Sequence, residues 1–290
     1  MRARRQLYLW MPPLVCAAAA GLAEAAPAAP AEVLHTVYRA DQPFPEFQPL
    51  WHESWRTRKE EDKDTHYFKE LPLGAYVHVY VRNTGNQPIA IGDVRLEGVG
   101  LAEAVRLGKD ERADINPASV RIAKIPQEQI DRLVQLGEPV WWRADPDTLP
   151  PGGVAGITIR LRRKPPAEIT HLNTEVLCGH TPLPAQVAIG QPQPYLAGLS
   201  FALDFSEVIA YVRTTGKAGA APVRFSIDGR DVTDRSRILA DPALDTAVIV
   251  APLDPPLEQG SFHYFQADFA DGTRAAAGLR AAADEFRYGM

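Results

Sequence analysis

The chain has 290 residues, of which 46% are hydrophobic and 23% charged, and its formal net charge at pH 7 is −5. This length suggests roughly two domains, and the composition is that of a globular chain able to bury a core. The negative charge argues against a general nucleic-acid binder or a protein that lies on anionic membranes. The 26 prolines are an unusually large share and favour strands with frequent turns over long helices.

The first 25 residues have the pattern of a cleavable signal peptide. Arginines at positions 2, 4 and 5 precede an apolar run from Leu7 to Ala20, and residues 23–25 have the small-x-small form of a cleavage site. Cleavage near Ala25 predicts a secreted or periplasmic protein. It leaves 28 of the 31 basic residues and 35 of the 36 acidic ones, a formal charge of −7. No later stretch reaches the roughly 18 apolar residues of a membrane span, so none is expected in the mature chain.

Residues 26–40 are expected to form a tether and a first edge strand at Val33 to Tyr38, and residues 41–190 the first of two β-sandwich domains. Within this domain the segment AYVHVYVRNTGNQPIAIGDVRL, residues 75–96, predicts two strands and a tight connection. Its first half alternates in the way that suits a pleated, half-buried surface. The two faces are Tyr76, His78 and Tyr80 on one side, and Val77, Val79 and Val81 on the other.

One short helix and three further strands complete the predicted first domain. The segment PQEQIDRLVQL favours a helix near 127–136, because a proline starts it, apolar residues recur on one face and Gly137 ends it. Residues 154–162 alternate, which points Ile157, Ile159 and Leu161 inward. Strands at 174–177 and 185–189 are expected to close the sandwich.

A second domain is predicted for residues 195–282, after a polar, proline-rich spacer at 190–194. Asp-Gly pairs at 228–229 and 271–272 predict hairpin turns, and the nearly all-apolar strand at 246–251 is expected at the centre of a sheet. About seven strands at short spacing is the count of an immunoglobulin-like sandwich. Residues 283–290 are expected to begin a further segment or form a tail. The predicted strands include 199–205, 208–212, 223–227, 246–251, 261–269 and 274–280.

Two segments carry a resemblance to known families. Residues 77–85, VHVYVRNTG, lead a strand into an Asn-Thr-Gly turn, and residues 149–153, LPPGG, precede an alternating strand. The second region resembles the immunoglobulin-like and fibronectin-III-like modules of secreted bacterial multidomain proteins. The first resembles the β-sandwich modules found N-terminal to glycoside hydrolase-type catalytic domains. The resemblance implies an all-β chain of two tandem antiparallel, immunoglobulin-like β-sandwiches.

Four tryptophans are the candidate ligand-binding residues. Trp51, Trp55, Trp141 and Trp142 carry flat apolar faces of the kind that stack on sugar rings. Packing in the core or between loops is the alternative for each of them, because tryptophan is usually largely buried. Trp51 and Trp55 are favoured as platforms, since they lie in a polar, loop-like context.

No catalytic residue, metal or cofactor is predicted. Cys178 is the single cysteine after the signal peptide, and His171, Cys178 and His180 lack a zinc-site spacing and a fourth ligand. The aspartates at 145, 147, 228, 231 and 234 suit ordinary turns as well as they suit calcium. No phosphate loop, Gly-x-Ser-x-Gly or His-Glu-x-x-His motif occurs.

These features predict a secreted, non-catalytic accessory or scaffold region of a carbohydrate-processing protein, with weak glycan contact through loop aromatics. One alternative is a glycoside hydrolase or other hydrolase with its active site beyond residue 290 or in the loops. Another is a periplasmic or surface adhesion module that binds protein by strand addition at a sheet edge. The expected partner is a polysaccharide or a protein, and not a nucleic acid.

Overall fold

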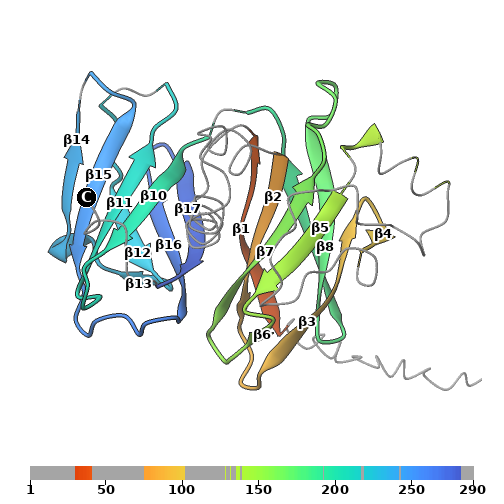
Figure 1. Cartoon of the computed structure of the whole chain (residues 1–290), viewed down its shortest axis with the longest axis horizontal. Helices are drawn as coiled ribbons and strands as arrows, with labels where there is room; N and C mark the ends of the chain where they lie inside the picture. Colours follow the sequence, from red (N-terminus) through yellow and green to blue (C-terminus); the bar gives the residue numbers. More distant parts are fainter. Residues whose placement is uncertain are drawn as a thin grey trace, which may run out of the picture.

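The computed structural model describes residues 30–40, 75–101 and 139–281, apart from short gaps at 192, 217–218 and 242, together with isolated positions at 128, 131 and 135–137. The described residues are mostly β-strand and form four antiparallel sheets, paired into two sandwiches that follow one another along the chain (Figure 1). The predicted fold class, two tandem antiparallel β-sandwiches, is confirmed. No helix in this part of the protein is long and apolar enough to cross a lipid bilayer.

The first sandwich pairs a sheet of order β1-β2-β7-β5 with a sheet of order β4-β3-β8-β9, and β6 is added to β3. If the strands other than β6 are lettered in chain order as A, B, C, C′, D, E, F and G, the two sheets are the A-B-E-D and C′-C-F-G sheets of an immunoglobulin-like domain. The strands are β1 (Ala31–Ala40), β2 (Ala75–Asn83), β3 (Ile89–Leu96), β4 (Val99–Gly100), β5 (Pro139–Asp145), β6 (Thr148–Leu149), β7 (Val154–Leu161), β8 (His171–Cys178) and β9 (Thr181–Ala188).

The second sandwich repeats this strand order. Its sheets are β10-β11-β15-β14 and β13-β12-β16-β17, which again correspond to A-B-E-D and C′-C-F-G. The immunoglobulin-like fold therefore follows from the topology of both sandwiches. The elements are β10 (Tyr195–Phe201), β11 (Glu207–Arg213), β12 (Arg224–Ile227), β13 (Arg230–Asp231), the 3-10 turn η4 (Thr233–Arg235), β14 (Arg237–Ala240), β15 (Thr246–Pro252), β16 (Phe262–Asp268) and β17 (Arg274–Arg280).

Alternating side chains supply a separate core for each sandwich. In β7, Ile157, Ile159 and Leu161 are buried as predicted, because every second residue of the strand faces the opposite sheet. In the second sandwich Phe201 of one sheet packs against Phe265 of the other, with ring centroids 5.9 Å apart. Burial of such side chains removes apolar surface from water, which is the main force that holds the two sheets together.

The Asn-Thr-Gly segment carries the chain from one sheet to the other, since β2 and β3 lie in opposite sheets of the first sandwich. Asn83 is buried at this crossing. Its side-chain amide donates hydrogen bonds to the carbonyls of Gln87 (2.7 Å) and Leu149 (3.0 Å). Its side-chain oxygen accepts a bond from the backbone N–H of Gly85 (2.8 Å). One asparagine thus fixes the shape of the connection.

The structure differs from the predicted elements in two respects. β10 ends at Phe201, and Leu203, which was predicted to continue the strand, lies in the following turn with 63% of its surface exposed. The short strands β4, β6, β13 and β14 were not predicted, because so few residues show no clear alternation. In the range of the predicted helix, Glu128, Asp131 and Gln135 are helical, and most other positions of this range lie outside the described residues.

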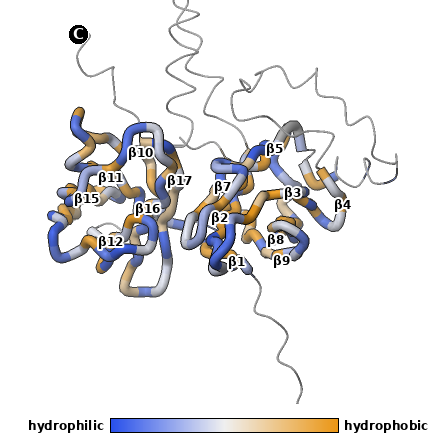
Figure 2. Tube along the Cα trace, turned by 90° about the horizontal axis from the view of Figure 1, so that it is seen from below, coloured by the Kyte–Doolittle hydropathy of each residue, from blue (hydrophilic) through white to orange (hydrophobic). Residues whose placement is uncertain are grey.

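The two sandwiches pack against each other face to face, so the molecule is a stack of four sheets (Figure 1, Figure 2). A third apolar cluster joins Val37, Tyr80 and Val154 of the first sandwich to Tyr264 and Ala276 of the second. The sheet β1-β2-β7-β5 is therefore covered on both sides. This is why nearly all of β2 is buried, although its sequence predicted a half-buried strand.

Candidate functional site

The centre of the interface between the sandwiches is aromatic and tightly packed. The rings of Tyr80 and Tyr264 lie 4.9 Å apart, centroid to centroid. Gly156 on β7 and Gly278 on β17 permit this approach, since a Cβ on Gly278 would overlap the ring of Phe262 and lie 3.0 Å from Tyr80. A Cβ on Gly156 would lie 3.3 Å from the same phenylalanine ring. The interface is thus shaped by one small residue from each sandwich.

Polar and basic side chains are buried beside this aromatic centre. Arg39 is 2% exposed and donates a hydrogen bond to the carbonyl of Ala276 across the interface (2.8 Å). Nδ1 of His78 lies 3.1 Å from the hydroxyl of Thr158. Burial, followed by the nearby Arg274 and Arg39, lowers the pKa of His35 to about 4. Burial, followed by Arg39, also lowers the pKa of His78 well below its ordinary value, so both imidazoles are neutral at pH 7.

An ion pair closes the rim of the interface. Arg280 on β17 binds both carboxylate oxygens of Asp145 at the end of β5, through Nε (3.0 Å) and Nη2. The same guanidinium donates to the carbonyl of Gly260 (2.7 Å). Two parallel bonds from one arginine to one carboxylate set an orientation as well as a distance. The contact therefore fixes how the two sandwiches are turned relative to each other.

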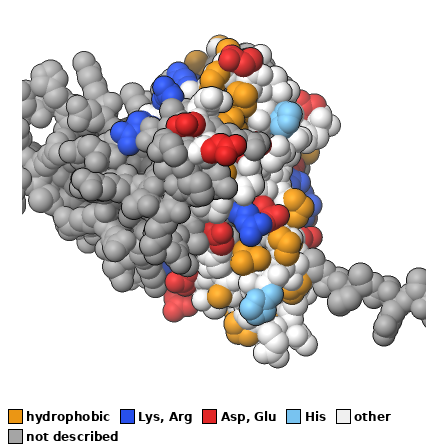
Figure 3. Space-filling model, turned by 90° about the vertical axis from the view of Figure 1, so that its right-hand side faces the viewer, with side chains coloured by type: hydrophobic (Ala, Val, Ile, Leu, Met, Phe, Trp, Pro, Cys, Tyr) orange, Lys and Arg blue, Asp and Glu red, His pale blue; other side chains and the backbone are white. Residues whose placement is uncertain are grey.

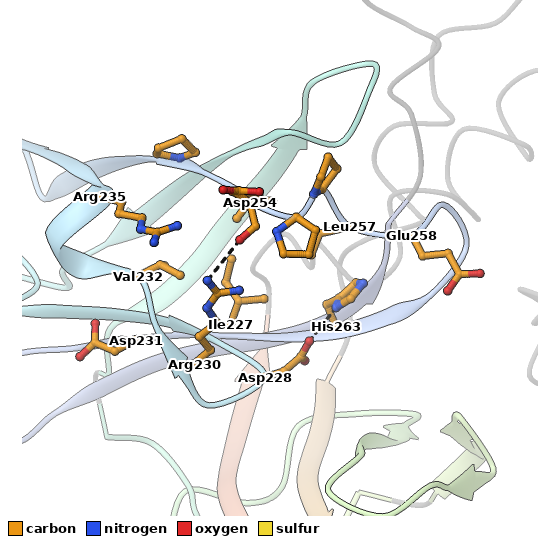
Figure 4. Close-up of a pocket in the computed structure, with 14 residues that line it drawn as sticks. Ile227, Asp228, Arg230, Asp231, Val232, Arg235, Asp254, Leu257, Glu258 and His263 are labelled. Carbon is orange, nitrogen blue, oxygen red and sulfur yellow. Dashed lines mark hydrogen bonds and ion pairs between the residues drawn. The ribbon is translucent and has the colours of Figure 1, made fainter.

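A cavity of about 480 Å³ lies in the second sandwich (Figure 4). One wall is the β12–β13 hairpin with η4, and the other is the loop between β15 and β16. Asp228 and Gly229 have φ angles of +54° and +84°, the left-handed pair of a type I′ turn, as the Asp-Gly sequence predicts. Pro255 and Pro256 cannot donate to a strand ladder, which keeps the opposite wall open as a loop.

Charged groups surround an apolar floor in this cavity. The floor includes Leu253 and Leu257, and the guanidinium groups of Arg230 and Arg235 point toward the centre in Figure 4. Arg230 donates to the backbone carbonyl of Asp254 (3.2 Å). Hydrogen-bonding groups placed around an apolar surface are the usual make-up of a site for a small polar ligand.

A chain of three hydrogen-bonded side chains forms one edge of the cavity. Nδ1 of His263 lies 2.7 Å from Asp228, and its Nε2 lies 2.5 Å from Oγ of Ser261. The order Ser-His-Asp resembles a hydrolase triad. The Ser261 hydroxyl also contacts the carbonyl of Glu258, which can only accept a hydrogen bond, so this carbonyl and the imidazole compete for its single proton. A nucleophilic serine must hand that proton to the imidazole, so the contact with Glu258 opposes activation of Ser261.

Of the four tryptophans proposed as glycan platforms, only Trp142 has its side chain among the described residues. Trp142 is fully buried in the first core, where its indole N–H donates to the carbonyl of Leu101 (3.0 Å). A side chain with no exposed surface cannot stack on a sugar, so Trp142 belongs to the core. Trp141 is part of β5, and its side chain lies outside the described residues, as do Trp51 and Trp55.

The histidine and cysteine set does not converge. Cys178 is buried in the first core and burial raises the pKa of its thiol to about 11, whereas His171 and His180 are exposed. Among the residues that the structure describes, no three His, Cys, Asp or Glu side chains come together in a way that would hold a metal ion.

At the first-sandwich end of the molecule, charged, apolar and histidine side chains are mixed on the visible surface (Figure 3).

No protein-family model and no curated protein matches this chain. Among solved structures, it is similar to SGBP-B from a complex xyloglucan utilization locus in Bacteroides uniformis, with 11% identity and a TM-score of 0.23 over 72% of this chain and 45% of that one. The tandem Ig repeats of Dlar are 12% identical, with a TM-score of 0.29 over 71% of this chain and 88% of theirs. The CupB2 chaperone of Pseudomonas aeruginosa is 13% identical, with a TM-score of 0.21 over 71% and 92%.

This chain spans less than half the length of the first of these structures. Because TM-scores this low do not support an argument of their own, the immunoglobulin-like fold rests on the strand order of the two sandwiches. What the similar proteins bind is accordingly a property of those proteins, and a fold of this kind serves many functions.

Proposed function

We propose that this chain is a secreted, non-catalytic accessory region of a carbohydrate-processing protein, in which two immunoglobulin-like sandwiches act as one rigid unit. The observation that carries the proposal is the face-to-face interface, where Tyr80 packs on Tyr264 and Arg280 binds Asp145. Independent domains joined by a spacer would not need a buried arginine such as Arg39 between them. A rigid unit holds neighbouring domains or ligands at a set distance.

Weak glycan contact is part of this proposal. Trp51, Trp55 and Trp141 remain the candidate stacking platforms. The cavity lined by Arg230 and Arg235 adds a second candidate contact, since guanidinium groups beside an apolar floor suit the hydroxyls and CH faces of a sugar. The Ser261–His263–Asp228 arrangement supports a non-catalytic role, because the carbonyl of Glu258 competes with His263 for the serine proton.

The test uses residues 26–290 as purified protein. Affinity electrophoresis against a panel of plant and bacterial polysaccharides should show retardation by at least one of them. The variants Trp51→Ala, Trp55→Ala and Arg235→Ala then identify the contact, with Arg237→Ala on the outer side of β14 as the matched control. Hydrolysis of aryl-glycosides by the purified chain would contradict the non-catalytic role, and the absence of any polysaccharide binding would contradict the carbohydrate role.

A further inference from the structure

The outer face of the sheet β10-β11-β15-β14 carries a contiguous apolar surface. Tyr211 on β11 and Leu239 on β14 are 37% and 46% exposed, and both pair with Val248 of β15 between them. In the neighbouring row Ile209 pairs with Val250, both are half-buried, and the exposed Arg237 of β14 lies at the edge of the row. We call the five apolar residues the β11–β15 patch. A continuous apolar patch on an exposed sheet face is typical of an interaction surface.

The sheet at the other end of the molecule shows that the fold does not require such a patch. The outward residues of β8 include His171, Asn173 and Glu175. Glu175 forms an ion pair with Arg95 of β3 (3.0 Å). Polar residues are the usual outward set of an antiparallel sheet with one face in water. The apolar β11–β15 patch is therefore a property of the second sandwich in particular.

The β11–β15 patch lies at the end of the stack away from the first sandwich (Figure 1). The partner sheet of this sandwich, β13-β12-β16-β17, faces the first sandwich through Tyr264 and Ala276. The patch is thus separated from the established interface by the whole second core. A second molecule can approach it without disturbing the contact between the sandwiches.

Charges at the two ends of β11 indicate which surface complements the patch. The outward residues of this strand are Glu207, Ile209, Tyr211 and Arg213, an apolar pair between an acidic and a basic end. Arg213 is oriented on this face by a hydrogen bond to the hydroxyl of Thr246 (2.9 Å). The two charged ends are about 20 Å apart along the strand, so they do not pair within one molecule.

The same surface on a second molecule supplies the complementary charges. If two copies meet face to face about a two-fold axis perpendicular to the strands, β11 of one copy runs antiparallel to β11 of the other. Glu207 of each copy then lies opposite Arg213 of its partner, and the apolar residues meet in the centre. The parallel arrangement would place like charges opposite each other, which costs free energy.

We propose that the β11–β15 patch is the interface of a symmetric dimer, in which two copies of this chain pack their β10-β11-β15-β14 sheets against each other with β11 antiparallel. Two-fold contacts of one patch with itself are the commonest form of protein self-association. The dimer extends the stack of four sheets to eight, and it places the two first sandwiches at the far ends.

Sedimentation velocity of residues 26–290 over a range of concentrations tests this proposal. The wild-type chain should sediment as a dimer that dissociates on dilution. Glu207→Arg alone and Arg213→Glu alone should each weaken dimerisation about tenfold or more, because each places like charges opposite each other. The double variant Glu207→Arg/Arg213→Glu restores both pairs and should restore the dimer. Tyr211→Lys, which puts a charge in the apolar centre, should give a monomer.

The matched control is Arg95→Glu at the other end of the stack, which should leave the dimer unchanged. Far-UV circular dichroism and thermal unfolding confirm that each variant folds. A wild-type chain that stays monomeric at all concentrations would overturn the proposal. So would a dimer that survives Tyr211→Lys, or single and double charge variants that behave alike. None of these outcomes depends on glycan binding, so the proposed function is tested separately.

Discussion

At the scale of single residues, small side chains and satisfied polar groups decide how closely the two sandwiches approach. Gly278 lies beneath the ring of Phe262, and Gly156 contacts the same ring from the other sandwich. Asn83 makes three hydrogen bonds at the crossing between β2 and β3. Neither role is visible in the composition, because each depends on which backbone lies opposite the residue.

The variant Gly278→Ala is expected to destabilise the protein by about 1–3 kcal/mol, the usual range for overpacking a filled site. The added Cβ overlaps the ring of Phe262, which Gly156 confines from the other side. Urea unfolding measures the change. The second substitution Phe262→Leu should recover part of the loss, and an unchanged free energy of unfolding in Gly278→Ala would contradict the tight packing.

The variant Tyr264→Phe is expected to keep the stability of the protein or raise it by up to about 1 kcal/mol. The Tyr264 hydroxyl is buried and has no hydrogen-bond partner among the described residues, and burial raises its pKa. Phenylalanine keeps the contact with Tyr80 and removes this cost. The melting temperature measures the effect. A clear loss of stability would show that the hydroxyl is hydrogen-bonded in solution, and Tyr264→Ala serves as the destabilising control.

At the scale of elements, β2 has two buried faces with different chemistry. Its valines face the first core, while Tyr76, His78 and Tyr80 lie on the opposite face, where Tyr80 packs against the second sandwich. The three rings stack along the strand, with centroid distances of 6.2 Å and 6.4 Å. A strand of this kind tolerates neither a polar substitution on the valine face nor a charge on the aromatic face.

The buried histidines predict that stability falls in mild acid. Burial holds the pKa of His35 at about 4 and that of His78 well below its ordinary value, so the unfolded chain binds protons near pH 6.5 that the folded protein binds only at lower pH. The free energy of unfolding should therefore be largest above pH 6.5 and decline as the pH falls from 6.5 towards 4, with the shift of His35 alone contributing about 3 kcal/mol.

Urea unfolding at pH 7.5, 6, 5 and 4.5 measures this decline. Carboxylates contribute mainly below this window, so the double variant His35→Gln/His78→Gln should flatten the profile between pH 6.5 and 5. His171→Gln is the matched control, because that histidine is exposed on β8. A profile of the double variant as steep as that of the wild type would contradict the role of the interface histidines.

At the scale of the whole molecule, the interface makes the two sandwiches one structural unit. Two separate cores are joined by a third apolar cluster, by Arg39 and by the pair of Arg280 with Asp145. Because Arg39 and Tyr264 would be exposed if the sandwiches separated, we expect the chain to unfold in a single cooperative transition.

The variant Asp145→Asn is expected to cost about 1 kcal/mol, since the pair is bidentate but partly exposed to solvent. Arg280→Gln should cost a similar amount, and the double variant less than the sum, because both changes remove the same contact. Urea unfolding gives the three free energies, and small-angle scattering reports whether the sandwiches separate. Fully additive costs would show that the two side chains do not interact.

Much of the fold and little of the candidate site was predictable. Alternation at Ile157, Ile159 and Leu161 predicted a strand with its inward face, and the Asp228-Gly229 pair predicted its hairpin. Such patterns are local, because a strand exposes alternate side chains to opposite faces wherever it lies. The cavity was not predicted, because its walls come from segments that are distant in sequence and meet only after both sheets form.

The sequence by itself determined the all-β class, the two sandwiches and most of the strands, since periodicity and turn chemistry act over a few residues. Only the tertiary structure decided that Trp142 is in the core, that Tyr80 meets Tyr264, and that Ile209 and Tyr211 on the outer side of β11 stay partly exposed. The physical reason is that alternation assigns the residues of a strand to its two faces but does not determine what packs against each face. That depends on which sheet packs opposite, and therefore on contacts between residues far apart in the chain.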